Sequence, residues 1–223
     1  MGKVWDRWAP LTGLASVACS VVGTLMVLSQ PQDKDSNATI VAYFADHSHR
    51  VKGFAGFFVF LAGILLLLLF LASVRERLLE RDRGAGRLGA LAFGAGVGAA
   101  VLWVVSMLLA NATTLAASEG NGFRVEPNTF RLLGDTAYYG WVAALAVGAV
   151  VVWATSLGAL RTGVLPRWFA ILGLAAGASM LFGYLFFPFF AWWIWIVLAS
   201  ILLVRREAVA RPAAALEHAS ATS

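Results

Sequence analysis

The sequence predicts an all-α membrane protein, a six-helix transmembrane bundle with two longer outer loops that carry short interfacial helices. Two observations lead to this fold class. Only 13% of the 223 residues are charged and 60% are hydrophobic, whereas an ordinary soluble domain has about 25% charged residues. The apolar residues also gather in six segments that contain no Asp, Glu, Lys, Arg or His. So few charged residues do not cover a soluble globule, and a water-soluble monomer is excluded.

The lengths of the six segments follow the thickness of a bilayer. A hydrocarbon core of about 30 Å needs roughly 20 residues of helix at about 1.5 Å per residue. Pro188 separates the last two segments, because proline has no N–H and disfavours a helical conformation at the residue before it. We expect these two segments to form a tight hairpin. The expected spans are Trp8–Ser29, Gly53–Val74, Leu88–Ala110, Thr136–Leu160, Trp168–Phe187 and Phe189–Val204.

Lys and Arg in the connections predict the orientation, because short cytoplasmic loops are enriched in these residues. With the N-terminus in the cytoplasm, most of the basic residues lie inside: Lys3, Arg7, Arg75, Arg77, Arg81, Arg83, Arg87, Arg161, Arg167, Arg205, Arg206 and Arg211. The others lie outside: Lys34, Arg50, Lys52, Arg124 and Arg131. We therefore expect one transmembrane domain over residues 1–206, both termini in the cytoplasm, and a disordered cytoplasmic tail over residues 207–223.

The two long outer connections, Gln30–Lys52 and Asn111–Asp135, contain helix signals. Ser36 is a suitable N-cap, and an apolar face at helical spacing follows it: Ile40, Tyr43, Phe44 and His47. These signals predict a helix over Ser36–Arg50 that lies on the bundle or in the lipid headgroups. Pro127 suits the first position of a helix, so we expect the fourth helix to begin there, outside the bilayer.

Small and aromatic residues predict how the bundle packs. Small residues at four-residue spacing let helices approach closely in lipid, and two such ladders occur: Ala90, Gly94 and Gly98, then Gly173 and Gly177. Aromatic residues crowd around Pro188: Phe186, Phe187, Phe189, Phe190, Trp192, Trp193 and Trp195. Such a cluster is typical of a membrane-interface belt. The alternative is the wall of a pocket for an apolar or aromatic ligand.

The sequence contains no catalytic signature. It lacks the G-x-S-x-G, H-E-x-x-H and P-loop patterns, and its one cysteine, Cys19, excludes a disulfide and a paired-thiol oxidoreductase. No expected span holds the lysine that a retinal Schiff base needs, or a charged group for a proton relay. We therefore expect no enzyme. We also expect no nucleic-acid binding, because the basic residues flank membrane spans.

Neutral polar and aromatic residues remain as candidates for ligand binding. The residues selected are Asn111, Tyr138, Tyr139, Tyr184, Phe187 and Trp192. They predict a multi-pass protein that binds or passes a small apolar or neutral molecule between its helices. The alternative is a structural or signalling accessory subunit of another membrane protein. The expected partners are membrane lipid, a small apolar ligand, and a membrane protein or a second copy of the chain.

Asp46, His47 and His49 form the densest group of reactive side chains. Carboxylate and imidazole are ligands for zinc and copper, and histidine changes its charge near neutral pH. The third hypothesis is therefore a metal or pH sensor on the outer face. On a helix, however, residues two apart do not face each other, so a solvated helix end is the alternative. Apart from zinc or copper at this place, we expect no cofactor.

Three short stretches carry a resemblance to a known group of proteins. They are R-W-A-P-L-T-G-L at Arg7–Leu14, A-Y-F-A-D-H at Ala42–His47 and L-P-R-W at Leu165–Trp168. With this spacing over residues 5–206, the chain resembles uncharacterised six-span membrane proteins of high-GC bacteria. The resemblance implies the fold class and a location in a bacterial plasma membrane, and it implies no activity. The preference for Arg over Lys and the many Ala residues agree with a bacterial origin.

Overall fold

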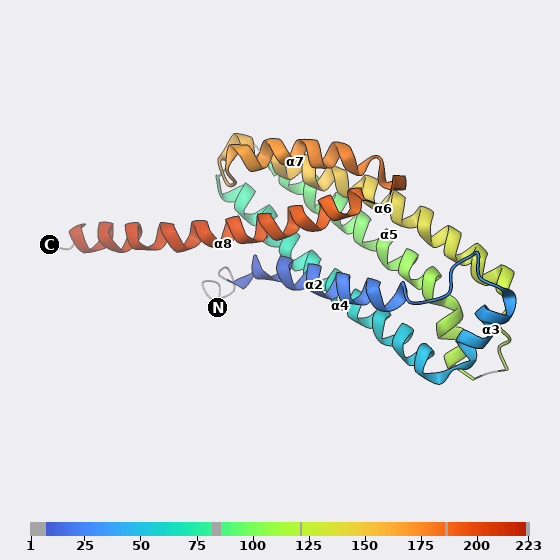
Figure 1. The fold of residues 1–223 in the computed structure, drawn as a ribbon. Coiled ribbons are helices and arrows are strands. Elements are labelled where there is room, and N and C mark those ends of the chain that lie inside the picture. The colour runs from blue at the N-terminus through green and yellow to red at the C-terminus, as the bar shows by residue number, and fades with distance from the viewer. Residues whose placement is uncertain (1–7, 82–85, 121, 186, 222–223) are drawn as a thin grey trace.

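In the computed structural model the described residues, namely 8–81, 86–120, 122–185 and 187–221, form helices joined by loops (Figure 1). No strand occurs in these ranges, so the prediction of an all-α fold is confirmed. In chain order the elements are α2 (Leu11–Val27), α3 (Asn37–Ala45), α4 (His47–Arg81), α5 (Gly86–Ser118), α6 (Pro127–Thr162), α7 (Arg167–Met180), the 3-10 turn η1 (Gly183–Leu185) and α8 (Pro188–Ala221).

Four helices are long and apolar enough to cross a membrane. They are α4, α5, α6 and the part of α8 from Pro188 to Arg206, and they fit a membrane protein. The other two apolar helices, α2 and α7, have 17 and 14 residues. At about 1.5 Å per residue, α7 is roughly 21 Å long, less than a hydrocarbon core of about 30 Å. The expected count of six spans is therefore not confirmed.

The chain reverses direction before Pro188 over a longer stretch than expected. The fifth span was expected to reach Phe187, but α7 ends at Met180. The chain then tightens into i+3 hydrogen bonds, with the N–H of Phe182 donating to Ser179 O at 3.0 Å, and continues into η1. Pro188 is the first residue of α8, where its fixed φ suits a helix and no N–H is needed. Helix α8 then extends to Ala221, into the stretch that the sequence assigns to the tail.

A break at Asp46 divides the expected helix over Ser36–Arg50. Ser36 does cap α3, because its hydroxyl accepts from the N–H of Thr39 at 3.1 Å. Asp46 then has an extended backbone, and its carboxylate accepts from the N–H and the hydroxyl of Ser48, both at 2.7 Å. A carboxylate in this position caps the next helix, so α4 begins at His47. The expected boundaries are wrong at this point, and His47 belongs to the membrane helix rather than to the apolar face of α3.

The helices form a bundle in which α5 packs along α6 and α2 packs along α4. Helix α7 packs on α6, and α8 lies against both α2 and α7 (Figure 1). Helix α3 closes one end, called here the α3 end, where Ile40 and Phe44 pack on Phe130 of α6. Large side chains fill the core between α4, α5 and α8, among them Phe60 and Trp192. Helix α2 begins, and α8 ends, at the opposite end of the bundle.

Glycine at the α2–α4 crossing lets the two backbones touch. A Cβ on Gly23 would lie 2.7 Å from the backbone N of Phe60 and 2.8 Å from Gly56 O. Gly173 and Gly177 of α7 are also in close contact, with Ser156 and Trp153 of α6, as expected.

The other expected small-residue ladder is confirmed at Gly98, where a Cβ would lie 3.6 Å from Val147 of α6, but it is wrong at Ala90 and Gly94. Ala90 and Gly94 are exposed, and a Cβ on Gly94 would meet nothing within 4 Å. The small residues that α5 buries belong to a neighbouring stripe: Gly89, Ala92, Gly96, Ala99 and Ala100. Spacing within one helix does not show which of its faces meets a neighbour.

The two kinds of glycine give a matched pair of substitutions. Gly23→Ala is expected to lower the free energy of unfolding by about 1–3 kcal/mol, because backbone atoms cannot move away from the new methyl group. Gly94→Ala is expected to leave it unchanged or to raise it by up to about 1 kcal/mol, because alanine favours helix. Tryptophan fluorescence during thermal unfolding in detergent measures both. Equal transition temperatures for the two variants would contradict the close crossing.

Candidate functional site

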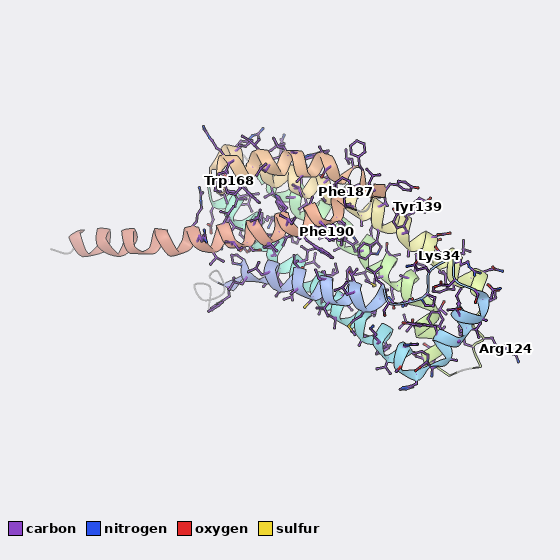
Figure 2. The ribbon with its side chains drawn as sticks, viewed as in Figure 1. Lys34, Arg124, Tyr139, Trp168, Phe187 and Phe190 are labelled. Atoms are coloured by element: carbon purple, nitrogen blue, oxygen red, sulfur yellow. The ribbon has the colours of Figure 1, made fainter. Side chains whose placement is uncertain are left out.

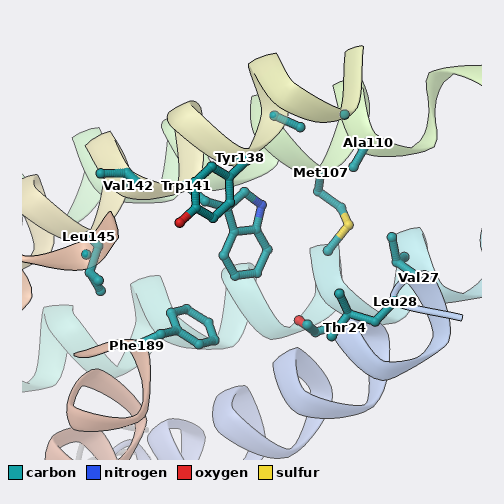
Figure 3. Close-up of a pocket in the computed structure, with 13 residues that line it drawn as sticks. Thr24, Val27, Leu28, Met107, Ala110, Tyr138, Trp141, Val142, Leu145 and Phe189 are labelled. Carbon is teal, nitrogen blue, oxygen red and sulfur yellow. The ribbon is translucent and has the colours of Figure 1, made fainter. Parts of the chain in front are cut away.

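A cavity of about 180 Å³ lies between α2, α5, α6 and the start of α8, towards the α3 end of the bundle (Figure 3). Its walls are almost entirely apolar: Val27, Leu28, Met107, Ala110, Gly134, Ala137, Tyr138, Trp141, Val142, Leu145, Gly183 and Phe189, with Thr24 as a further polar residue. An apolar cavity of about 150 Å³ is large enough to bind benzene. This cavity therefore has room for a molecule of at least that size.

Small residues and the turn before α8 create this space. Gly134 and Ala137 lie on the face of α6 that meets the cavity, where larger residues would fill it. The hydroxyl of Tyr138 donates to the backbone carbonyl of Tyr184 at 2.7 Å. This bond fixes the Tyr138 ring as a wall of the cavity. Because α8 begins at Pro188, it also brings Phe189 to the cavity.

A wider hollow of about 520 Å³, called here the vestibule, adjoins the cavity at the α3 end. The two hollows share Val27, Leu28, Ala110 and Gly134. The vestibule is also lined by the polar loop that follows α2: Gln30, Pro31, Gln32, Asp33 and Lys34, with Phe130 opposite. The cavity therefore leads from an apolar interior to a polar opening beneath this loop.

Hydrogen bonds attach the loop to α5 at its beginning. The side-chain amide of Gln30 donates to Asn111 Oδ1 at 3.0 Å and to Thr114 Oγ1 at 3.3 Å. Asn111 is fully buried, and its Nδ2 donates to Met107 O at 3.0 Å. Asn111, which was expected to bind ligand, thus lies one helical turn after the cavity residue Met107 on α5. Its side-chain amide attaches the loop after α2 to α5 through Gln30.

Arg131 of α6 attaches the same loop further along. Its Nε donates to Asp33 O at 2.8 Å and its Nη2 donates to Asp35 O at 2.9 Å. Partial burial raises the pKa of the Asp33 carboxyl, and the negative charge and hydrogen bond of Asp135 raise it further, whereas Arg131 lowers it. Two carboxyl groups therefore meet at the edge of the vestibule.

The six residues that were expected to bind ligand do not lie together in the structure. Tyr138 lines the cavity and Asn111 lies behind it. Tyr139, Tyr184 and Phe187 are 63%, 66% and 62% exposed, and Figure 2 shows Tyr139 and Phe187 at the surface of the bundle. Trp192 is buried in the core, where its ring lies 5.1 Å from that of Trp103.

Of the residues that line the cavity, Tyr138 alone was selected as a ligand-binding candidate from the sequence; those not selected include Thr24, Met107, Gly134 and Trp141. Sequence analysis gives no signal for Met107 and Trp141, since both fit ordinary apolar spans. Thr24 offers a weak signal as a hydroxyl within an apolar span. Gly134 offers another, because glycine weakens a helix and needs a reason to be there.

The group Asp46, His47 and His49 does not converge on one point. Asp46 caps α4, and hydrogen bonds from the Ser48 hydroxyl and N–H lower the pKa of its carboxyl. His47 is exposed. The ring of His49 stacks on Tyr43 with 4.1 Å between the ring centroids. Within the described ranges no three His, Cys, Asp or Glu side chains could hold a metal ion together. Zinc or copper binding stays a prediction.

Asp33→Asn tests the carboxyl pair at the vestibule. Because the pKa of Asp33 is raised above its ordinary value of 3.8, the folded loop binds a proton more tightly than the unfolded chain does. Attachment of the loop should therefore strengthen as pH falls from 7 and stop changing below 3.8. Asp33→Asn removes the repulsion between the carboxylates of residue 33 and Asp135. At pH 7 the backbone amides of its loop should therefore be up to about fivefold more protected from hydrogen exchange than those of the parent.

The difference between Asp33→Asn and the parent should disappear below pH 3.8, where the parent carboxyl is neutral. Exchange rates over residues 28–36, corrected for the intrinsic rate at each pH, provide the measurement. Glu119→Gln makes the same change of charge on an exposed residue of the other loop and should have no effect on residues 28–36. If residues 28–36 of Asp33→Asn were less protected than those of the parent at pH 7, this result would contradict the inferred repulsion between Asp33 and Asp135.

No protein family, curated protein or solved structure matches this chain. The cavity and the residues around it therefore provide the basis for a functional proposal.

Proposed function

We propose that the protein is a multi-pass membrane protein that binds a small, largely apolar molecule in the cavity between α2, α5, α6 and α8. The observation that supports this proposal is the apolar cavity of about 180 Å³ with its polar vestibule. Binding sites for small molecules are concave and mostly apolar, with a few polar groups that orient the ligand. The cavity has these properties.

The chemistry of the walls favours an uncharged ligand. Among the described residues that line the cavity, none is charged. A charged group placed there would lose its hydration without a partner, which costs far more than burial of a neutral group. Apolar atoms of a ligand, in contrast, would leave water or lipid and contact Met107, Trp141 and Phe189.

We propose further that the vestibule faces outwards from a bacterial plasma membrane, with both termini in the cytoplasm. Among the basic residues that support this orientation, Arg75 and Arg161 lie in the last two turns of α4 and α6, and the C-terminal ends of these helices lie away from the α3 end (Figure 1). Arg206 donates a hydrogen bond to Gly163 O, where α6 ends. In this orientation a ligand reaches the cavity from the outer side through the vestibule.

Gly134→Leu tests the cavity as the binding site. A Cβ at this position would meet only Asp33 Oδ1, at 3.6 Å, so leucine should fill the cavity without a backbone clash. The probe is an eight-carbon alkane that carries a diazirine, used with the protein in lipid vesicles. In the parent we expect saturable labelling of the peptides with Met107 and Trp141, and in Gly134→Leu we expect it to be at least about tenfold weaker.

Gly94→Leu provides the matched control. It makes the same change at an exposed glycine on α5, where nothing lies within 4 Å, and it should keep the parent's saturable labelling. Labelling by probe dissolved in the bilayer does not saturate, whereas labelling in the cavity does. An excess of octane should therefore suppress labelling in the cavity and leave labelling from the bilayer unchanged. Parent protein without any saturable labelling of the cavity peptides would contradict the proposal and favour an accessory subunit.

Two introduced cysteines test the orientation. Gly120 lies between α5 and α6 near the α3 end, Arg161 lies at the other end of α6, and both are exposed. In a Cys19→Ser background, a membrane-impermeant maleimide should label Gly120→Cys in intact cells. It should label Arg161→Cys only after the membrane is permeabilised. The reverse pattern would contradict the orientation.

A further inference from the structure

The Thr24 hydroxyl is a buried polar group of the cavity wall that has no hydrogen-bond partner. Thr24 is only 8% exposed, and no described residue bonds its hydroxyl. Figure 3 draws the Thr24 oxygen on the side that faces Trp141 and Phe189, which line the same cavity. An unpaired hydroxyl in an apolar site has lost its bonds to water without replacement, which is unfavourable.

Hydroxyls on helices usually avoid this state by bonding to their own backbone. Several do so here. Ser106 Oγ donates to Leu102 O at 2.7 Å, and Thr162 Oγ1 donates to Gly158 O at 2.9 Å. Thr24 makes no such bond, and its oxygen is buried in this structure. A turn of the side chain about its Cα–Cβ bond would present the hydroxyl to the cavity, where it can both donate and accept.

Thr24 differs in its position from the other unpartnered buried atoms of the described chain. These are Thr155 Oγ1, the hydroxyls of Ser156 and Ser200, and the indole nitrogens of Trp103 and Trp195. None of these residues lines the cavity. Tyr138, which does line it, already donates its hydroxyl proton to Tyr184. The Trp141 indole, which also lines the cavity, can only donate. Thr24 is therefore the described cavity side chain whose hydroxyl is unpaired and can both donate to and accept from a polar atom.

We propose that Thr24 forms a hydrogen bond with the bound molecule, and that the ligand class is a neutral, largely apolar compound with one hydroxyl or carbonyl group. This inference rests on the proposed function. Val27 and Leu28 line both the cavity and the vestibule, whereas Thr24 lines the cavity alone. The polar group of the ligand therefore lies at the end away from the vestibule, and its apolar part lies between Thr24 and the opening.

Two photoreactive probes of the same length test this assignment in lipid vesicles. One is the eight-carbon alkane with a diazirine, and the other is the corresponding terminal alcohol. In the parent, both probes should label the peptides that contain Met107 and Trp141. The concentration at which labelling saturates should be about tenfold lower for the alcohol than for the alkane. This factor is within the range expected for one hydrogen bond in a site without water.

Thr24→Val removes the hydroxyl and keeps the shape of the side chain. It should abolish the tenfold preference for the alcohol and leave labelling by the alkane unchanged. Thr24→Ser keeps a hydroxyl and should keep the preference. Thr155→Val makes the same change at a buried, unpartnered threonine away from the cavity and should leave both probes as in the parent.

The outcomes separate this inference from the proposed function. If alkane and alcohol saturate the cavity of the parent equally, the site binds apolar molecules but Thr24 has no role in recognition. If Thr24→Val weakens both probes equally, Thr24 has a structural role only, and the inference is again overturned. If neither probe labels the cavity of the parent, the proposed function fails as well.

Discussion

The close crossing of α2 and α4 determines where the cavity can form. At Gly23 the two backbones are so near that even a methyl group would press on Phe60 N and Gly56 O. This contact holds α2 against the bundle, and the residues that follow it, Thr24 and Val27, become a wall of the cavity opposite α6. Close packing of backbones at a small residue holds two helices together even where no hydrophobic force acts between them. Without this contact the cavity would lose the wall that α2 provides.

Polar groups hold the opening of the cavity in shape. The loop after α2 is joined to α5 through Gln30 and Asn111, and to α6 through Arg131. Asn111 contributes from a fully buried position, where an amide without partners would be costly. Its bonds to Gln30 and to Met107 O satisfy it and connect the loop with the helix that supplies Met107 to the cavity. Attachment of the loop and the form of the cavity are therefore linked.

The sequence predicts those features that depend on local chemistry. The all-α fold, the Ser36 cap and the first helical residue Pro127 are confirmed, because each depends on a few neighbouring residues. The end of α7 at Met180 and the face of α5 depend on which helices pack together, and the ladder with Gly94 shows that spacing alone does not give this. For the site, Tyr138 was selected and Thr24 was not. Most hydroxyls in apolar helices bond to their own backbone, so an unpaired one is visible only in the structure.

Two features of the cavity are unfavourable for a protein that has only to fold. Gly134 lies inside the long helix α6, where glycine costs about 1 kcal/mol relative to alanine, although no close neighbour requires its small size. The unpaired Thr24 hydroxyl costs a further 1–3 kcal/mol or so. These residues are far apart in the sequence and lie on different helices, yet both line one cavity. A ligand would offset both costs together, because its apolar part fills the space beside Gly134 while its polar atom bonds Thr24.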